Sequence, residues 1–265
     1  MRVKVLNLEV DGQDVGLSYM RRFGSKPPLV CLHGFGSTKE DYADLALRAD
    51  FADRDLIFWD APGCGASALD DPDALNIPFL AAVVGAACDA FGLARIHLSG
   101  HSMGGLTGLL FAQAHQDRVL SFIDIEGNLT PEDCFLSRQI VDHPAETSEG
   151  FQASFIERVK ERPEYGSALY AAVLPLKVRS SSFKPIFSSM VDLSDNTDLM
   201  RMLEDLSCPK AFIYGEQNRH LSYLEDLPGI GVRVIEIPHS GHFPMYSNPP
   251  ALWSAMAKFL DEVDG

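Results

Sequence analysis

The sequence predicts an α/β protein: a mostly parallel, doubly wound sheet that carries an inserted helical lid. Short, nearly continuous apolar runs alternate with longer helical patterns over the first 127 residues, which is the rhythm of strands and crossover helices. The rhythm stops over residues 128–206, where only helical patterns occur, and it then resumes. One sheet interrupted once by helices accounts for these observations.

The N-terminal part predicts a hairpin followed by buried strands. Residues 3–10 and 15–20 alternate apolar and polar positions around Asp11-Gly12, which is typical of an antiparallel hairpin. Further strands are predicted at 28–32, 56–59, 95–99 and 119–125, and helices at 39–48, 78–91 and 103–115. These strands are apolar almost throughout, as expected of a parallel sheet covered on both faces.

The C-terminal half predicts the insertion and the end of the sheet. Loops are expected at Asp142-His143-Pro144 and Arg162-Pro163-Glu164, strands at 210–214 and 232–237, and a last helix at 250–263. We therefore predict a core domain formed by residues 1–127 and 207–265, and a helical cap formed by residues 128–206. The cap would lie over the carboxyl edge of the sheet, where open α/β sheets bind ligands.

The composition excludes several classes of partner. Lys and Arg number 22 while Asp and Glu number 37, so the formal net charge is −15 and the basic face of a nucleic-acid-binding protein is not expected. Without a run of 18 apolar residues, no membrane-spanning helix and no membrane partner are expected. The five cysteines are scattered without a C-x-x-C pair, and the first residues resemble a strand rather than the apolar core of a signal peptide. We expect a cytoplasmic protein with reduced thiols, and its state as monomer or homo-oligomer is left open.

The strongest chemical signal is Gly100-His101-Ser102-Met103-Gly104-Gly105, which follows a predicted strand and precedes a predicted helix. G-x-S-x-G in this setting is typical of a nucleophile elbow, a sharp turn that exposes a serine hydroxyl in a strained backbone conformation. The alternative is a glycine-rich turn that only allows close packing. Ser102 is thus the predicted nucleophile, and the helix N-terminus beneath it favours a developing negative charge. His101 receives no role because its side chain is expected to point away.

Two further motifs lie at the ends of neighbouring strands. His33-Gly34-Phe35-Gly36-Ser37 follows the strand at 28–32, and Asp60-Ala61-Pro62-Gly63-Cys64-Gly65-Ala66-Ser67 follows the strand at 56–59. Together with the elbow, these motifs resemble the α/β-hydrolase superfamily over almost the whole chain. The resemblance implies the α/β-hydrolase fold, the serine-nucleophile branch of esterases and lactonases, and an oxyanion hole formed by the backbone N–H groups of Phe35 and Met103. His33 is expected to be a structural residue of its loop.

The catalytic base is predicted in the loop Pro238-His239-Ser240-Gly241-His242-Phe243-Pro244, after the last predicted strand. The family places its histidine there, and the G-H-x-P form identifies His242, with Gly241 allowing the imidazole to approach the serine. His239 is the weaker candidate, expected in the loop or at the strand end. The two histidines lack a third metal ligand at a diagnostic spacing, so no metal is expected.

The triad acid is the point where the sequence departs from the usual family pattern. The family usually carries an Asp after the strand at 210–214, but this position holds Asn218, and an amide cannot stabilise an imidazolium as a carboxylate does. Some lactonases and dehalogenases take the acid from the end of the preceding strand, the sixth, where this chain has Glu126. Glu126 is therefore the predicted acid, and Glu216 and Asp124 are the alternatives.

These residues predict a serine hydrolase that cleaves a small-molecule carboxylic ester or lactone through an acyl-serine intermediate, without a metal or an organic cofactor. The alternatives are a C–C bond hydrolase or a cofactor-free perhydrolase on the same triad, and a hydrolase-fold binder without turnover. The predicted lid is rich in aromatic and methionine side chains, which core packing explains in large part and an apolar substrate pocket in the remainder. They are Phe135, Phe151, Phe155, Tyr165, Tyr170, Phe183, Phe187, Met190, Met200 and Met202.

Overall fold

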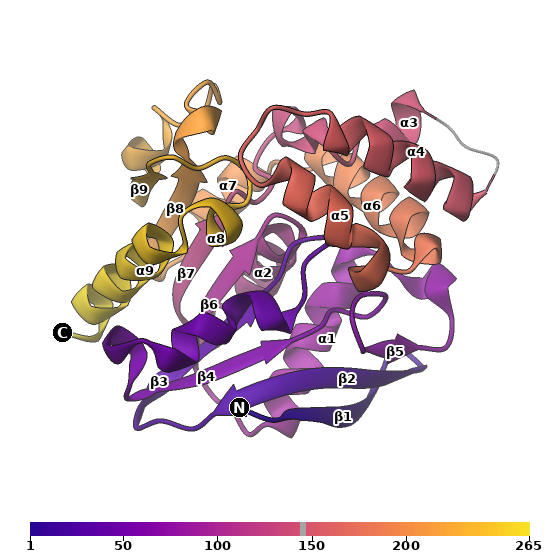
Figure 1. The fold of residues 1–265 in the computed structure, drawn as a ribbon. Coiled ribbons are helices and arrows are strands. Elements are labelled where there is room, and N and C mark those ends of the chain that lie inside the picture. Colours follow the sequence, from indigo (N-terminus) through magenta and orange to yellow (C-terminus); the bar gives the residue numbers. More distant parts are fainter. Residues whose placement is uncertain (144–146) are drawn as a thin grey trace.

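The structure is a computed structural model that describes residues 1–143 and 147–265 (Figure 1). Within these ranges the strands form one nine-stranded sheet in the order β1-β2-β4-β3-β6-β7-β8-β9, with the short β5 beside β2. The strands are β1 (Val3–Val10), β2 (Gln13–Arg22), β3 (Lys26–Leu32), β4 (Arg54–Trp59), β5 (Ala68–Leu69), β6 (Ile96–His101), β7 (Val119–Ile125), β8 (Lys210–Gly215) and β9 (Val232–Ile237). The predicted fold class, a mostly parallel α/β sheet, is confirmed.

The strands pair as the sequence predicts. β1 and β2 form the antiparallel hairpin, with Val3 opposite Met20 and with Asp11 in the left-handed region at a φ of 49°. β2 is also antiparallel to β4, and every neighbouring pair from β4 through β3 to β9 is parallel. Because parallel neighbours end on the same side, the loops that follow β3, β6, β7, β8 and β9 meet at one edge of the sheet.

Helices cover both faces of the sheet. α1 (Ile77–Ala90) and α2 (Met103–Ala114) pack against each other on one face, and α9 (Pro249–Asp264) covers the other face, as Figure 1 shows. None of the helices in the described ranges combines the length and the apolar character needed to cross a bilayer.

One predicted helix differs in kind. Residues 39–48 form a 3₁₀ helix, η1 (Lys39–Leu47), rather than an α-helix. Its first residue, Lys39, donates from its backbone N–H to Asp60, and Thr38 and Asp41 form a capping box. These local and tertiary contacts favour short 3₁₀ turns over the regular helix that the pattern predicts.

Helices fill the chain between β7 and β8. They are η5 (Pro131–Phe135), α3 (Gln139–Asp142), α4 (Ser148–Lys160), α5 (Ser167–Lys177), η6 (Ser180–Ser182), α6 (Phe183–Asn196) and α7 (Leu199–Glu204). Figure 1 shows α4, α5 and α6 together on the side of the molecule away from the β1–β2 hairpin. The expected loop Arg162-Pro163-Glu164 joins α4 to α5, whereas Pro144 of the other expected loop lies outside the described residues. The domain boundaries at 128 and 206 stay predictions.

Four phenylalanines of the helices between β7 and β8 pack as one cluster. Phe151, Phe155, Phe183 and Phe187 are each at most 2% exposed, and their ring centroids lie 5.5 to 6.3 Å apart. Phe35, from the loop after β3, joins them at 4.7 Å from Phe183 and 4.6 Å from Phe187. Core packing therefore accounts for these four side chains, and the cluster fixes α4 and α6 against the loop after β3.

Candidate active site

Ser102 occupies a strained turn between β6 and α2. Its φ of 51° and ψ of −116° lie outside the regions that L-residues favour, which is the mark of a residue whose position the surrounding structure enforces. The Ser102 N–H donates to the carbonyl of Ile125 at 2.9 Å, and its own carbonyl accepts from Leu106 N at 3.0 Å. Ser102 is thereby held at the start of α2 and beside the end of β7.

The glycines of the elbow are required by close backbone contacts. A Cβ added to Gly100 would lie 2.1 Å from the Gly104 carbonyl oxygen, and a Cβ on Gly104 would lie 2.4 Å from the Leu32 carbonyl oxygen. Any side chain at either position would force β6, α2 or β3 apart. The motif is therefore needed for the turn itself.

Glu126 and His242 are brought together at the same edge. His242 Nδ1 lies 3.2 Å from Glu126 Oε2, and a carboxylate only accepts, so Nδ1 carries the proton and Nε2 is left as the basic nitrogen. Glu126 Oε1 also accepts from Gly215 N at 2.7 Å, and Oε2 accepts from Asn218 Nδ2 at 2.6 Å. The φ of Glu126 is 53°, so the left-handed turn after β7 falls on Glu126 itself.

The two alternative acids lie elsewhere. Glu216 Oε1 is 3.6 Å from Nδ1 of His239, whose side chain is 83% exposed. Asp124 is fully buried and accepts from Gly127 N at 2.9 Å, and burial raises the pKa of its carboxyl well above the usual value. Of the three candidates, the structure brings only Glu126 to His242.

The predicted oxyanion loop is fixed by His33. Burial lowers the pKa of His33 in spite of the nearby Asp60, so the ring is neutral. It donates from Nδ1 to the Gly34 carbonyl at 2.8 Å and accepts from Ala61 N at Nε2 at 2.8 Å. Among the described residues, the backbone N–H groups of Phe35 and Met103 donate to no protein acceptor. An oxyanion requires two such free donors, so the assignment of Phe35 and Met103 to the oxyanion hole stays a prediction.

His101 has a contact that sequence reasoning missed. The expectation that its side chain points away from the site is wrong: the fully buried ring places Nε2 2.7 Å from the main-chain oxygen of His242, to which it donates. Burial, and then the proximity of His242, holds the pKa of His101 well below its usual range, so the ring is neutral. The ring needs the space left by Gly34, where a Cβ would lie 2.4 Å from His101 Nδ1.

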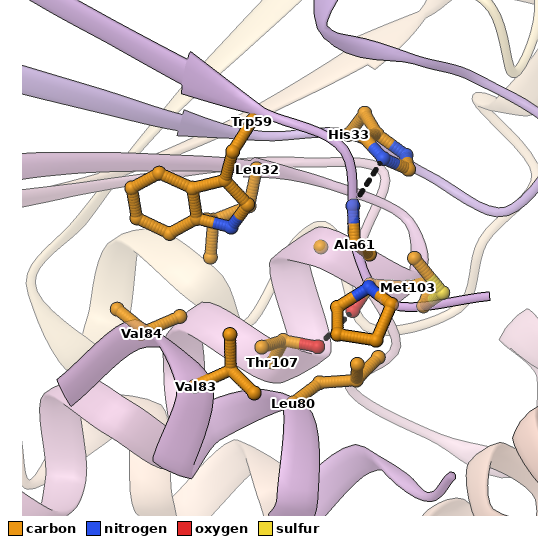
Figure 2. Close-up of a pocket in the computed structure, with 11 residues that line it drawn as sticks. Leu32, His33, Trp59, Ala61, Leu80, Val83, Val84, Met103 and Thr107 are labelled. Atoms are coloured by element: carbon orange, nitrogen blue, oxygen red, sulfur yellow. Dashed lines mark hydrogen bonds between the residues drawn. The ribbon is translucent and has the colours of Figure 1, made fainter. Parts of the chain in front are cut away.

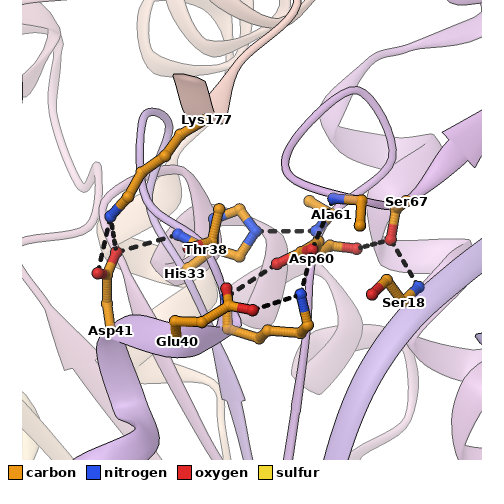
Figure 3. Close-up of polar contacts among 11 residues, drawn as sticks. Ser18, His33, Thr38, Glu40, Asp41, Asp60, Ala61, Ser67 and Lys177 are labelled. Atoms are coloured by element: carbon orange, nitrogen blue, oxygen red, sulfur yellow. Dashed lines mark hydrogen bonds and ion pairs between the residues drawn. The ribbon is translucent and has the colours of Figure 1, made fainter. Parts of the chain in front are cut away.

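A polar network holds the loops after β3 and β4 together (Figure 3). Asp60 accepts from the backbone N–H of Lys39 at 2.9 Å and from its Nζ at 2.7 Å, and its carbonyl accepts from Ser67 Oγ at 2.6 Å. At the other end of the network, Lys177 from α5 donates to both carboxylate oxygens of Asp41, at 2.7 and 2.8 Å. The role of this network is structural, because none of its hydrogen bonds involves Ser102 or His242.

Two cavities differ in what they can hold. The cavity in Figure 2, between Trp59, Leu80 and Met103, has a volume of about 20 Å³, which is room for one water molecule. A second cavity of about 350 Å³ is lined by His242, Phe243, Phe135 and Arg162, and this volume suits a small organic molecule. The Phe135 ring lies 4.9 Å from the His242 ring, edge to face, so this lid residue lines the site.

The chain is similar to known proteins in both sequence and fold. The model of the alpha/beta hydrolase fold matches residues 27–165. The 2-hydroxy-6-oxononadienedioate/2-hydroxy-6-oxononatrienedioate hydrolase of Burkholderia vietnamiensis is 32% identical over 123 residues, covering 44% of this chain and 41% of that protein. The pimeloyl-[acyl-carrier protein] methyl ester esterase of Aeromonas hydrophila is 32% identical over 121 residues, covering 45% and 43%. The enol-lactonase structure from Burkholderia xenovorans LB400 gives a TM-score of 0.73 at 20% identity, over 97% of this chain and 100% of that chain. The family model spans more than half of the sequence, and the chain therefore belongs to the α/β-hydrolase family of enzymes.

Proposed function

We propose that the protein is a serine hydrolase that cleaves a carboxylic ester or lactone of a small molecule through an acyl-serine intermediate. The observations that carry this proposal are the strained Ser102 directly after β6 and a His242 imidazole whose Nδ1 is held by Glu126. His101, which precedes Ser102, contacts the main-chain oxygen of His242 and so links the two. A serine is a weak nucleophile at neutral pH, and a neighbouring imidazole oriented by a carboxylate activates it.

In the proposed mechanism, Ser102 Oγ attacks the substrate carbonyl while His242 Nε2 takes its proton. The carbonyl oxygen becomes an oxyanion that accepts from the N–H groups of Phe35 and Met103. His242 then gives the proton to the leaving alcohol, and Glu126 stabilises the imidazolium throughout. In the deacylation step, the same imidazole deprotonates a water molecule that attacks the acyl carbon. The imidazolium then returns the proton to Ser102 Oγ as the acid is released.

The decisive experiment replaces the nucleophile. Ser102→Ala should leave the fold intact, because the elbow depends on its glycines, while hydrolysis of p-nitrophenyl esters should fall by about 10⁶-fold, as when members of a triad act as one unit. The measurement is kcat on a panel of esters and lactones, with fluorophosphonate labelling of the parent protein. If the verified variant kept a tenth of the turnover, the acyl-serine mechanism would be wrong.

The second candidate function is C–C bond hydrolysis, which the 32% identity to the Burkholderia vietnamiensis hydrolase favours. A C–C hydrolase would turn over a vinylogous β-diketone faster than its ester panel. A binder without turnover would react with neither substrate nor fluorophosphonate, since an unactivated serine does not attack phosphorus.

A further inference from the structure

The surroundings of His242 and of Phe35 are filled to different degrees. The 350 Å³ cavity is bounded by His242 and Phe243 and by residues of η5 and of the α4–α5 connection. Phe35 lies in the loop after β3 and supplies one of the proposed oxyanion donors, and the residue is 5% exposed. The cavity lining includes His242 but none of Ser102, Phe35 and Met103, so His242 is the group through which this cavity adjoins the proposed triad.

The side of Phe35 is filled by protein. Phe183 and Phe187 pack on the Phe35 ring at 4.7 and 4.6 Å, and Phe151 and Phe155 close the cluster behind them. A long apolar group could enter here only by displacing rings that are at most 5% exposed. Displacing side chains from a close-packed interior costs free energy.

The chemistry assigns a substrate part to each side. With the carbonyl oxygen bound by the N–H groups of Phe35 and Met103, the leaving oxygen must lie within hydrogen-bond reach of His242 Nε2 in order to take its proton. Resting on the proposed function, we propose that the cavity beside His242 holds the alcohol part of the substrate, and that the substrate is an ester of a short acyl group with a bulky, uncharged or cationic alcohol.

The charges on the cavity wall indicate which charge the alcohol part of the substrate can carry. Arg162 is already paired with Glu164. Its Nη2 donates to Glu164 Oε1 at 2.7 Å, and its Nε donates to Oε2 at 3.2 Å. Glu132 accepts from Ser222 N and Oγ, at 3.1 and 2.6 Å, and forms no ion pair within the described residues. Two carboxylates against one guanidinium leave this wall negative, which disfavours an anionic alcohol.

The size of each part is tested with two series of esters. From acetyl to octanoyl esters of one alcohol, kcat/KM should fall by about tenfold or more, a factor that corresponds to 1.4 kcal/mol. From methyl to benzyl acetate it should rise, after division by the rate of hydroxide-catalysed hydrolysis. Phe187→Leu should recover part of the octanoyl activity, whereas the control Phe111→Leu, equally buried but on α2, should not. A parent enzyme that prefers octanoyl esters would overturn the proposal.

The charge is tested with benzyl acetates that carry a meta trimethylammonium or a meta carboxylate group. The cationic ester should be preferred by about tenfold, and Glu132→Gln should reduce this preference while Glu157→Gln, on the exposed face of α4, should not. A preference for the carboxylate ester would contradict the assignment. In either case, fluorophosphonate labelling of Ser102 keeps the two proposals apart: labelling with the wrong selectivity overturns only the substrate class, and absence of labelling overturns the serine mechanism.

Discussion

In the proposed triad, Asn218 and Glu126 share the task that a single Asp has in the usual family pattern. Asn218 stands where that Asp is expected, and its amide donates to Glu126 Oε2 at 2.6 Å, beside the contact with His242. The sequence identified both positions but not the bond between them, because it joins residues 92 positions apart in the chain. In the proposed triad, the Asn218 amide would orient Glu126 toward His242.

The role of Glu126 is tested by removing its charge alone. Glu126→Gln preserves the shape of the side chain, but the amide permits the wrong imidazole tautomer and leaves the imidazolium without a counter-charge. We expect kcat to fall by up to about 10⁴-fold, as for the equivalent Asp→Asn change in serine proteases. Glu216→Gln and Asp124→Asn are the matched controls, measured with the same ester. If Glu216→Gln lost more activity than Glu126→Gln, the assignment of the acid would be reversed.

His101 is proposed as a positioning residue for the general base. His101→Leu removes the donor to the His242 carbonyl, which frees the loop that carries the imidazole. A misplaced catalytic group costs up to about 10²-fold in rate, so we expect kcat to fall with little change in KM. His101→Gln retains an N–H donor and should recover part of kcat. A purely structural role would instead lower the thermal stability of both variants and leave their kcat alike.

At the scale of elements, sequence periodicity was most reliable where packing is regular. β7 covers the predicted residues 119–125 and is buried almost throughout, as expected of a continuous apolar run between two covered faces. β9 covers the predicted residues 232–237 at the edge of the sheet. The sequence predicted a helix where η1 forms but not its 3₁₀ type, and it did not predict the two-residue β5. Such elements depend on contacts like that of Lys39 with Asp60 and not on periodicity. The predicted direction of the His101 side chain was wrong for the same reason, since it depends on the contact with the main-chain oxygen of His242.

The side chain of Lys177 makes one of the contacts that join the helices between β7 and β8 to the rest of the molecule. Lys177, at the end of α5, donates to Asp41 in η1 and, at 3.1 Å, to the hydroxyl of Tyr246, and Tyr246 follows His242 in the chain. Lys177→Met would leave the Asp41 carboxylate, which is 12% exposed, without its cation. We expect a loss of about 1–3 kcal/mol in the free energy of unfolding, measured by urea titration.

The exposed Lys160→Met, which lies on α4 with its Nζ 3.5 Å from Glu157, is the control for this change and should cost little, since exposed pairs contribute weakly. If the two variants were equally stable, Lys177 would not anchor the insertion.

At the scale of the whole molecule, the buried histidines link stability to pH. Burial lowers the pKa of His33 and of His101, and burial together with Arg54 lowers the pKa of His97 to about 4. The contact between His97 Nε2 and Asp264, at 3.0 Å, is therefore a hydrogen bond from a neutral ring at neutral pH and not an ion pair. Asp133 has the opposite effect on how stability depends on pH. Burial raises its pKa to about 6, so the folded protein binds this proton more tightly than the unfolded chain does.

The sign of the His97 contribution follows from proton binding. Between pH 6.5 and about 4 the unfolded chain binds a proton at His97 that the folded protein refuses, so the free energy of unfolding falls as the pH falls through this window. One such proton changes the slope by at most about 1.4 kcal/mol per pH unit. His97→Gln should therefore flatten the decline between pH 6.5 and 4, whereas His143→Gln, at an exposed position, should leave it unchanged. Urea titrations at half-unit steps of pH measure both slopes, and a decline of equal steepness in the two variants would show that His97 is not among the groups that destabilise the fold in acid.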